Sequence, residues 1–244
     1  MSTSKVFYPN IYGGEIMENR GMAYQSLEYI GHEKSIDLPN IYIVGEAGSG
    51  KDYITDIIKE LYPGYQSVVI AHPLYEMVEY LRSNDKHRFI LLLEGLGLDY
   101  GQAVLAWNRV PIDLRKEIQS PLNEKPRNAL QVLGDILRSF NEYLLICRAI
   151  GKTINGPTII SDVRLSFEAE TLKKVGFIGV RVFAEDGVRI RRLKDRDRVV
   201  DFSKLKHKTE TEVSKIHCDY LIDNTIGIKT ELIYKIKDII KGAI

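Results

Sequence analysis

The chain has 244 residues, and its 34 Lys and Arg nearly balance 33 Asp and Glu, which leaves a formal net charge of +1 at pH 7. Such a balance gives no global field that would draw the protein to nucleic acid or to an anionic membrane, so any anion site must be local. Two cysteines at no metal-ligand spacing argue against a disulfide framework, and no apolar run approaches the ~18 residues of a membrane span. We therefore expect a soluble, cytoplasmic α/β protein.

The first clear strand pattern begins near residue 40, and it sets the expected division of the chain. Residues 1–39 are rich in Tyr and Gly and are predicted to be an N-terminal extension. Residues 40–244 are predicted to form one α/β domain. Within it we expect a helical lobe at about 74–157 and a basic flap at about 187–210.

A glycine-rich loop follows the first predicted strand, Ile41–Val44, and leads into a helix predicted from Tyr53 to Leu61. Its spacing is that of the Walker A phosphate-binding motif, G-x-x-x-x-G-K. Glycines let backbone N–H groups converge on phosphate, the helix N-terminus is positive, and the lysine reaches the terminal phosphates. The residues predicted to bind the nucleotide are Gly45, Gly48, Ser49, Gly50, Lys51 and Asp52.

Asp52 is the one departure from this motif, because a Ser or Thr usually stands there and ligates magnesium through its hydroxyl. A carboxylate at this place can hold the metal through water, or it can accept a hydrogen bond at the helix start. The departure narrows the family without removing the site.

A second buried strand is predicted at residues 67–71, and a long helical excursion follows it. Helices are predicted at 74–82, 100–107 and 127–150, while the apolar run Phe89–Leu93 fits a strand or a buried helix equally well. Such an excursion is too long for an ordinary crossover, so we expect it to form a lobe at the carboxyl edge of the sheet. On its last helix, Arg127, Gln131 and Arg138 are candidates for binding the acceptor substrate.

A third buried strand is predicted at 158–164, and it carries Asp162 and Arg164 at its carboxyl end. Beside a phosphate loop, Asp162 would either hold magnesium through water or orient the acceptor, and Arg164 would clamp phosphate with its planar fork. A helix at 166–175 and a strand at 177–183 are predicted next.

A strongly basic segment runs from Arg189 to Arg198 and precedes a last strand at 220–222 and a closing helix at 230–241. At helical spacing Arg189, Arg192 and Arg196 share one face. Arginines on a closing flap can stabilise the charge of a migrating phosphoryl group, and we expect two or three of them to contact phosphate.

The order of these segments resembles that of the nucleoside monophosphate kinases. The chain is most similar to the phage-type deoxynucleoside monophosphate kinases, which carry S-G-K-D as Ser49–Asp52 does here. Weaker similarities are Leu130–Gly134, the Asp162-Val163-Arg164 strand end, and Tyr220–Asn224 before the final helix.

This resemblance implies a P-loop kinase fold with a central parallel five-stranded sheet, ATP as donor, Mg²⁺, and a nucleoside monophosphate as acceptor. It places Lys51, Asp162, Arg164, Arg192 and Arg196 in catalysis, with Asp52 and Asp162 as the metal residues. A homodimer is compatible with the resemblance, and no membrane partner is expected.

Two related kinases stay open as alternatives. One would phosphorylate a hydroxymethylated pyrimidine in phage DNA, with the basic stretch Lys204–Lys208 on the nucleic acid. The other is similar to dephospho-coenzyme A kinase. A nucleotide-binding module without transfer activity and a DNA-bound ATPase are the readings from other functional classes.

Overall fold

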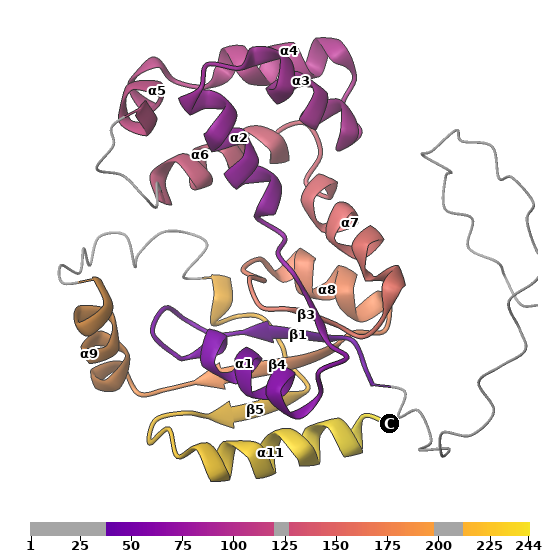
Figure 1. Cartoon of the computed structure of the whole chain (residues 1–244), viewed down its shortest axis with the longest axis vertical. Helices are drawn as coiled ribbons and strands as arrows, with labels where there is room; N and C mark the ends of the chain where they lie inside the picture. Colours follow the sequence, from indigo (N-terminus) through magenta and orange to yellow (C-terminus); the bar gives the residue numbers. More distant parts are fainter. Residues whose placement is uncertain (1–37, 120–126, 198–211) are drawn as a thin grey trace, which may run out of the picture. The chain divides into compact units, whose positions relative to one another are not determined.

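The computed structural model describes residues 38–119, 127–197 and 212–244. Its centre is a five-stranded sheet in the order β2-β3-β1-β4-β5, in which every neighbouring pair is parallel (Figure 1). The strands are β1 (Ile41–Val44), β2 (Gln66–Val68), β3 (Thr158–Ile160), β4 (Ile178–Phe183) and β5 (Tyr220–Asp223). The predicted α/β fold with a central parallel five-stranded sheet is confirmed.

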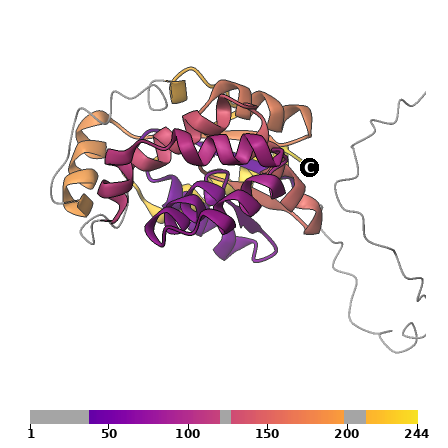
Figure 2. The same cartoon turned by 90° about the horizontal axis from the view of Figure 1, so that it is seen from above.

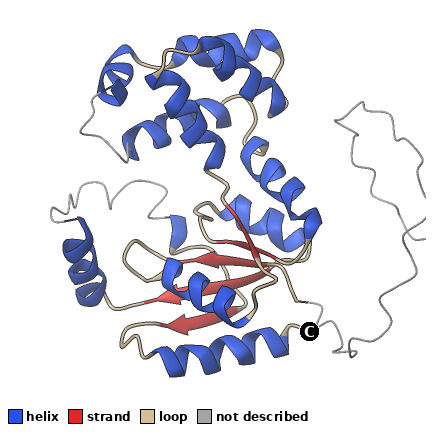
Figure 3. Ribbon diagram, in the orientation of Figure 1, coloured by secondary structure: helices blue, strands red, loops and turns tan. Residues whose placement is uncertain are grey.

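Helices cover both faces of this sheet (Figure 3). Those after β1 and β2 are α1 (Lys51–Leu61), α2 (His72–Arg82), α3 (Lys86–Gly95), α4 (Tyr100–Arg109), α5 (Ile112–Gln119), α6 (Arg127–Arg138), α7 (Leu144–Gly151) and the short 3₁₀ helix η1 (Lys152–Asn155). The later ones are α8 (Ser166–Lys174), α9 (Asp186–Asp197) and α11 (Lys229–Gly242).

The central strand β1 is buried on both faces because two apolar clusters meet at it. Ile41 and Ile43 pack into the cluster formed with α1 and α11, whereas Tyr42 and Val44 face the cluster that extends into α2 and α8. Successive side chains of a strand point to opposite faces, so one four-residue segment contributes to both layers. The uninterrupted apolar run is the pattern of a parallel strand covered on both sides.

The helices α2 to α6 pack on one another and form the helical lobe (Figure 2). The ambiguous segment Phe89–Leu93 lies within α3. Asp85 caps that helix by accepting the N–H of Arg88 at 3.0 Å, and Phe89 contacts Trp107 edge-to-face with ring centroids 5.0 Å apart. The cap and this buried aromatic pair explain why a helix forms here.

The prediction of one helix over 127–150 is wrong, since α6 ends at Arg138 and α7 begins at Leu144. The break contains neither Gly nor Pro. Instead, the side-chain oxygen of Asn141 accepts the N–H of Tyr143 at 2.9 Å, a local turn that competes with helical hydrogen bonding.

Two strands are shorter than predicted, and the two differences have one cause. β2 ends at Val68 and β3 at Ile160, whereas the predictions extended to 71 and 164. Beyond these ends the backbone N–H groups donate to buried carboxylates instead of to a neighbouring strand. The acceptors are Asp162 and Glu168, whose contacts are given below.

No helix within the described residues is long and apolar enough to cross a membrane.

Gly179 of β4 lies directly opposite Tyr42 in the sheet register, and a Cβ there would collide with the Tyr42 phenol ring. We expect Gly179→Ala to lower the free energy of unfolding by about 1–3 kcal/mol, the usual cost of overpacking a core. Urea denaturation would measure this loss. Gly95→Ala in α3 is the matched control, because a Cβ at Gly95 meets nothing within 4 Å. Equal stability of the two variants would contradict the packing described here.

Candidate phosphate-binding site

The glycine-rich loop connects the end of β1 to the start of α1, at the carboxyl edge of the sheet. Neighbouring strands β3 and β4 lie on either side of β1, so the loop occupies the switch point where ligands bind in open α/β folds. Gly48 and Gly50 have φ of 81° and 92°, the left-handed region that glycine tolerates best. Lys51 and Asp52 form the first turn of α1, where Lys51 is half-buried and Asp52 is exposed.

The last strand supports this loop from below through Asn224, which is 1% exposed. Its side-chain amide donates to the Ser49 carbonyl at 2.8 Å, and its backbone N–H donates to the Phe183 carbonyl at 2.8 Å. A Cβ at Gly50 would collide with that side-chain amide. Glycine is therefore required at position 50 by backbone conformation and by close packing together.

Two buried polar atoms at this support, Ser49 Oγ and Asn224 Oδ1, have no hydrogen-bond partner among the residues described. Buried polar groups are nearly always paired with protein, water or ligand. A polyanion with its water shell supplies such partners, so the site fits a phosphate ligand.

The basic segment forms helix α9, whose first two turns lie against the loop (Figure 1). Arg189 forms an ion pair with Glu46 and donates from Nε to the Ala47 carbonyl at 3.0 Å. One turn on, Arg192 donates to the carbonyls of Gly48 and Ser49 at 3.5 and 3.4 Å. Arginines predicted to contact phosphate thus contact the loop's own backbone in this structure.

Arg196 belongs to α9 by its backbone, but its side chain lies outside the described part. The same holds for the side chain of Arg127 at the start of α6. The flap beyond residue 197 and the basic stretch at 204–208 also fall outside the described residues. The roles given to these residues stay predictions.

Asp162 lies two residues beyond the end of β3 and is engaged at both carboxylate oxygens. Oδ1 accepts the N–H of Ile70 at 3.0 Å, and Oδ2 accepts the N–H of Ala71 at 2.9 Å. Burial raises the pKa of Asp162, although these two hydrogen bonds and the charge of Arg164 oppose the rise. The carboxylate therefore ties β3 to the turn that starts α2, which leaves it fewer lone pairs for a metal.

Glu168 of α8 is a buried carboxyl that the sequence did not single out as a site residue. Its Oε2 accepts the N–H groups of Arg164 and Leu165 at 2.9 and 3.0 Å, and it is 7% exposed. These bonds fold the chain between β3 and α8 so that Arg164 is exposed. The usable signal was a Glu at the third position of a helix, where it caps the preceding backbone.

The lobe contributes Gln131 and Arg138 from α6, and both are half-buried. Arg138 pairs with Asp135 at 2.7 Å and folds back over Gly134, where a Cβ would lie 3.0 Å from Nη2. Its charge also opposes the rise in the pKa of Glu168, which electrostatically couples the lobe to α8. Arg138 is thus near the turn that carries Arg164.

No cluster of three or more His, Cys, Asp or Glu suited to a metal occurs in the described ranges. Mg²⁺ typically takes only one or two protein carboxylates and completes its shell with water and substrate phosphates. With Asp162 already bound to backbone, the exposed carboxylate of Asp52 is the remaining metal candidate of the predicted pair.

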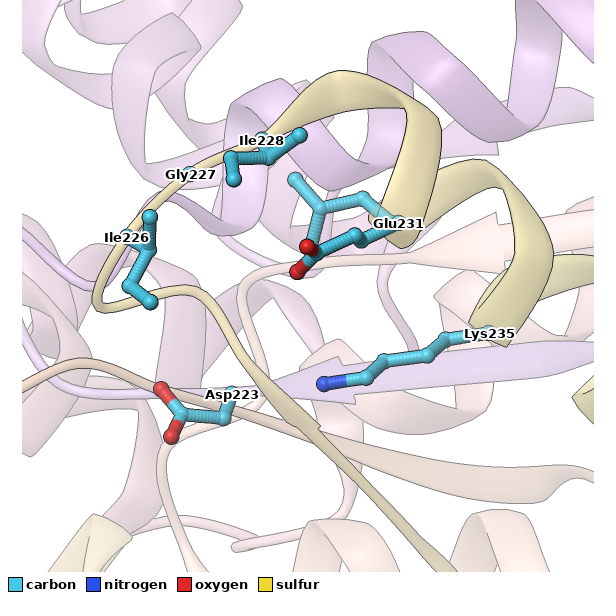
Figure 4. Close-up of a pocket in the computed structure, with 7 residues that line it drawn as sticks. Asp223, Ile226, Gly227, Ile228, Glu231 and Lys235 are labelled. Carbon is cyan, nitrogen blue, oxygen red and sulfur yellow. The ribbon is translucent and has the colours of Figure 1, made fainter.

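A small cavity of ≈ 80 Å³ lies between the loop after β5 and α11 (Figure 4). Asp223 and Lys235 lie on its floor, while Glu231 and Ile228 close it from above. Ligand pockets for small molecules usually enclose about 300–1,000 Å³. We assign this cavity no ligand.

The parallel sheet, with a Walker-type loop after its central strand, gives the arrangement of a P-loop α/β fold. No family model matches the sequence, and no curated protein is similar to it.

Three solved structures have related folds at low similarity. The protein TT1252 from Thermus thermophilus has 16% identity and a TM-score of 0.42, covering 84% of this chain and 97% of its own. A gluconokinase from Sinorhizobium meliloti 1021 has 15% identity and a TM-score of 0.41, covering 84% and 95%. Shikimate kinase from Acinetobacter baumannii, in complex with shikimate, has 16% and 0.42, covering 85% and 95%. Similarity at this level does not choose a substrate.

The buried carboxyl of Glu168 makes stability depend on pH. Burial is the main cause that raises its pKa from 4.5 to about 7, so the folded chain binds its proton more tightly than the unfolded chain does. This contribution is complete below pH 4.5 and is lost as the pH rises through about 7, at a cost of roughly 2–3 kcal/mol. Urea denaturation at pH 5 and pH 8 should show that Glu168→Gln loses less stability than the native chain.

The matched control is Glu170→Gln, which changes an exposed carboxyl on the same helix. It should follow the native pH dependence. Parallel curves for the native chain and Glu168→Gln would show that Glu168 ionises as it does in the unfolded chain.

Proposed function

We propose that this protein is an ATP-dependent phosphotransferase that converts a nucleoside or deoxynucleoside monophosphate to its diphosphate. The observation that carries the proposal is the glycine-rich loop between β1 and α1, with two glycines at positive φ and Lys51 at the helix start. Such a loop presents backbone N–H groups and a helix N-terminus to phosphate. The resemblance to phage-type deoxynucleoside monophosphate kinases supplies the acceptor class.

On the donor side, Gly48, Gly50 and Lys51 would hold the phosphates of ATP, and Asp52 would hold Mg²⁺ through water. The positive φ values of the glycines fit such a cradle, and the exposed Asp52 carboxylate fits an ion bound largely by water and phosphate. When bound, Mg²⁺ neutralises charge that develops on the phosphates. The lysine would position the terminal phosphates and add a second positive charge.

On the acceptor side, α6 would supply Arg127, Gln131 and Arg138, which recur at helical spacing along one face. Arg164 would contribute from the turn shaped by Asp162 and Glu168, since its side chain is exposed. Phosphoryl transfer needs positioning and charge stabilisation and no covalent enzyme intermediate. Residues from the lobe and from the sheet edge would together fix the acceptor phosphate in line with the donor.

The flap arginines divide into two groups under this proposal. Arg192 is bound to three backbone oxygens, those of Gly48, Ser49 and Asn224, and so acts on the shape of the loop. Arg196 follows one turn later on the same face and would be the arginine that stabilises the migrating phosphoryl group. This refines the expectation that both contact phosphate.

The direct test is ADP formation from ATP and magnesium with the purified chain, against a panel of nucleoside and deoxynucleoside monophosphates. We expect turnover with at least one free monophosphate, and Lys51→Ala should lower it at least about 100-fold because an aligned positive charge is lost. Lys59→Ala, at an exposed position in the last turn of the same helix, is the matched control and should retain activity.

The same assay separates the alternatives. Hydroxymethylated duplex DNA and dephospho-coenzyme A are offered in parallel with the monophosphates. Label that passes only to DNA, or only to dephospho-coenzyme A, would contradict the proposed acceptor class. ATP hydrolysis that needs DNA and no acceptor would contradict transfer altogether.

A further inference from the structure

Glu46 is an acidic side chain inside the loop that would bind phosphate. An isolated carboxylate at this place would repel a polyanion, since like charges a few ångströms apart cost free energy. In this structure Glu46 forms an ion pair with Arg189 of α9, and the two side chains are only 34% and 15% exposed. Solvent and salt therefore screen the pair less than an ordinary surface ion pair.

Arg189 holds the loop at a second point besides Glu46. Its Nε donates to the Ala47 carbonyl at 3.0 Å, and its Nη1 also reaches Asp186 of its own helix at 2.8 Å. The backbone of α9 follows closely, because a Cβ at Gly48 would lie 2.6 Å from the Arg189 carbonyl oxygen. The helix is thus seated directly on the loop, with Leu193 buried beside it.

Arg192 extends the same contact to the next two peptides of the loop, at the carbonyls of Gly48 and Ser49. Consecutive carbonyls from Ala47 to Ser49 therefore accept hydrogen bonds from arginines of one helix. In a trans peptide the C=O and the following N–H point in opposite directions. Fixing the carbonyls of Ala47 and Ser49 toward α9 directs the N–H groups of Gly48 and Gly50 away from it.

We propose that Glu46 and Arg189 are positioning residues that preorganise the loop as an anion receptor. Glu46 draws the Arg189 guanidinium to the carbonyl side of the loop, where it orients the peptides and leaves their N–H groups for phosphate. Preorganised dipoles need no rearrangement when the ligand arrives, so they bind it more tightly. This inference rests on the proposed function, because it requires that the loop bind phosphate.

The proposal makes an expectation opposite in sign to that of simple charge repulsion. If Glu46 were only a nearby negative charge, Glu46→Gln would tighten the binding of a phosphate ligand. If Glu46 acts through Arg189, the same change releases the guanidinium and loosens the loop, and binding weakens. The direction of one measured change decides between the two.

The test is calorimetric titration of ADP with magnesium into the full chain and its variants. We expect Glu46→Gln and Arg189→Gln each to raise the Kd for ADP about tenfold, equivalent to about 1.4 kcal/mol. Because both changes remove one interaction, the double variant should bind about as weakly as the weaker single variant. Asp186→Asn is the matched control, since Asp186 also pairs with Arg189 but is 84% exposed and lies outside the loop; it should stay within about twofold.

Unchanged or tighter ADP binding by Glu46→Gln would overturn the inference, and so would additive effects in the double variant. Should Arg189→Gln lose its cooperative thermal unfolding, Arg189→Lys replaces it, because it retains the charge without the planar fork and should still weaken binding. A native chain that binds no ADP would overturn the proposed function and this inference together. Native binding with no effect of Glu46→Gln would overturn this inference alone.

Discussion

The hydrogen bonding of one loop sets the terms for the rest of this structure. Every peptide of residues 45–50 carries a donor and an acceptor, and a phosphate site needs the donors turned inward and the acceptors satisfied elsewhere. Asn224 and the arginines of α9 meet those acceptors from the carbonyl side. The elements that supply them lie about 140–175 residues further along the chain. The last strand and the flap helix are therefore parts of the phosphate site as much as the Walker sequence itself.

Buried carboxylates do the corresponding work on the other side of the sheet edge. Asp162 holds two N–H groups at the start of α2, and Glu168 holds two at the turn before α8. Both end a strand and fix the direction in which the chain leaves the sheet. Burial without a full counter-charge raises the pKa of each group, which is the cost of using a carboxylate as a buried backbone acceptor.

The sequence was sufficient for the features that follow from local pattern. Apolar β-branched runs located β1 and β4, the glycine spacing located the loop, and the amphipathic pattern located α11. It failed where a long-range contact decides, because β2 and β3 stop where Asp162 and Glu168 take over the backbone N–H groups. It also missed that a side chain can end a helix, as Asn141 does between α6 and α7. Residue type suggested that Arg192 contacts a ligand, but only the structure shows that it contacts the loop backbone.

The most direct test of this account is hydrogen–deuterium exchange of the full chain with and without ADP and magnesium, read on peptides that cover the loop at 45–51 and the first turns of α9. The account predicts that ADP slows exchange in both peptides, because the loop N–H groups bind phosphate and the loop carbonyls are fastened to α9. It also predicts little change in the lobe helices α3 and α4. Protection by ADP confined to the lobe, or none in the loop, would contradict a phosphate site braced by the flap helix.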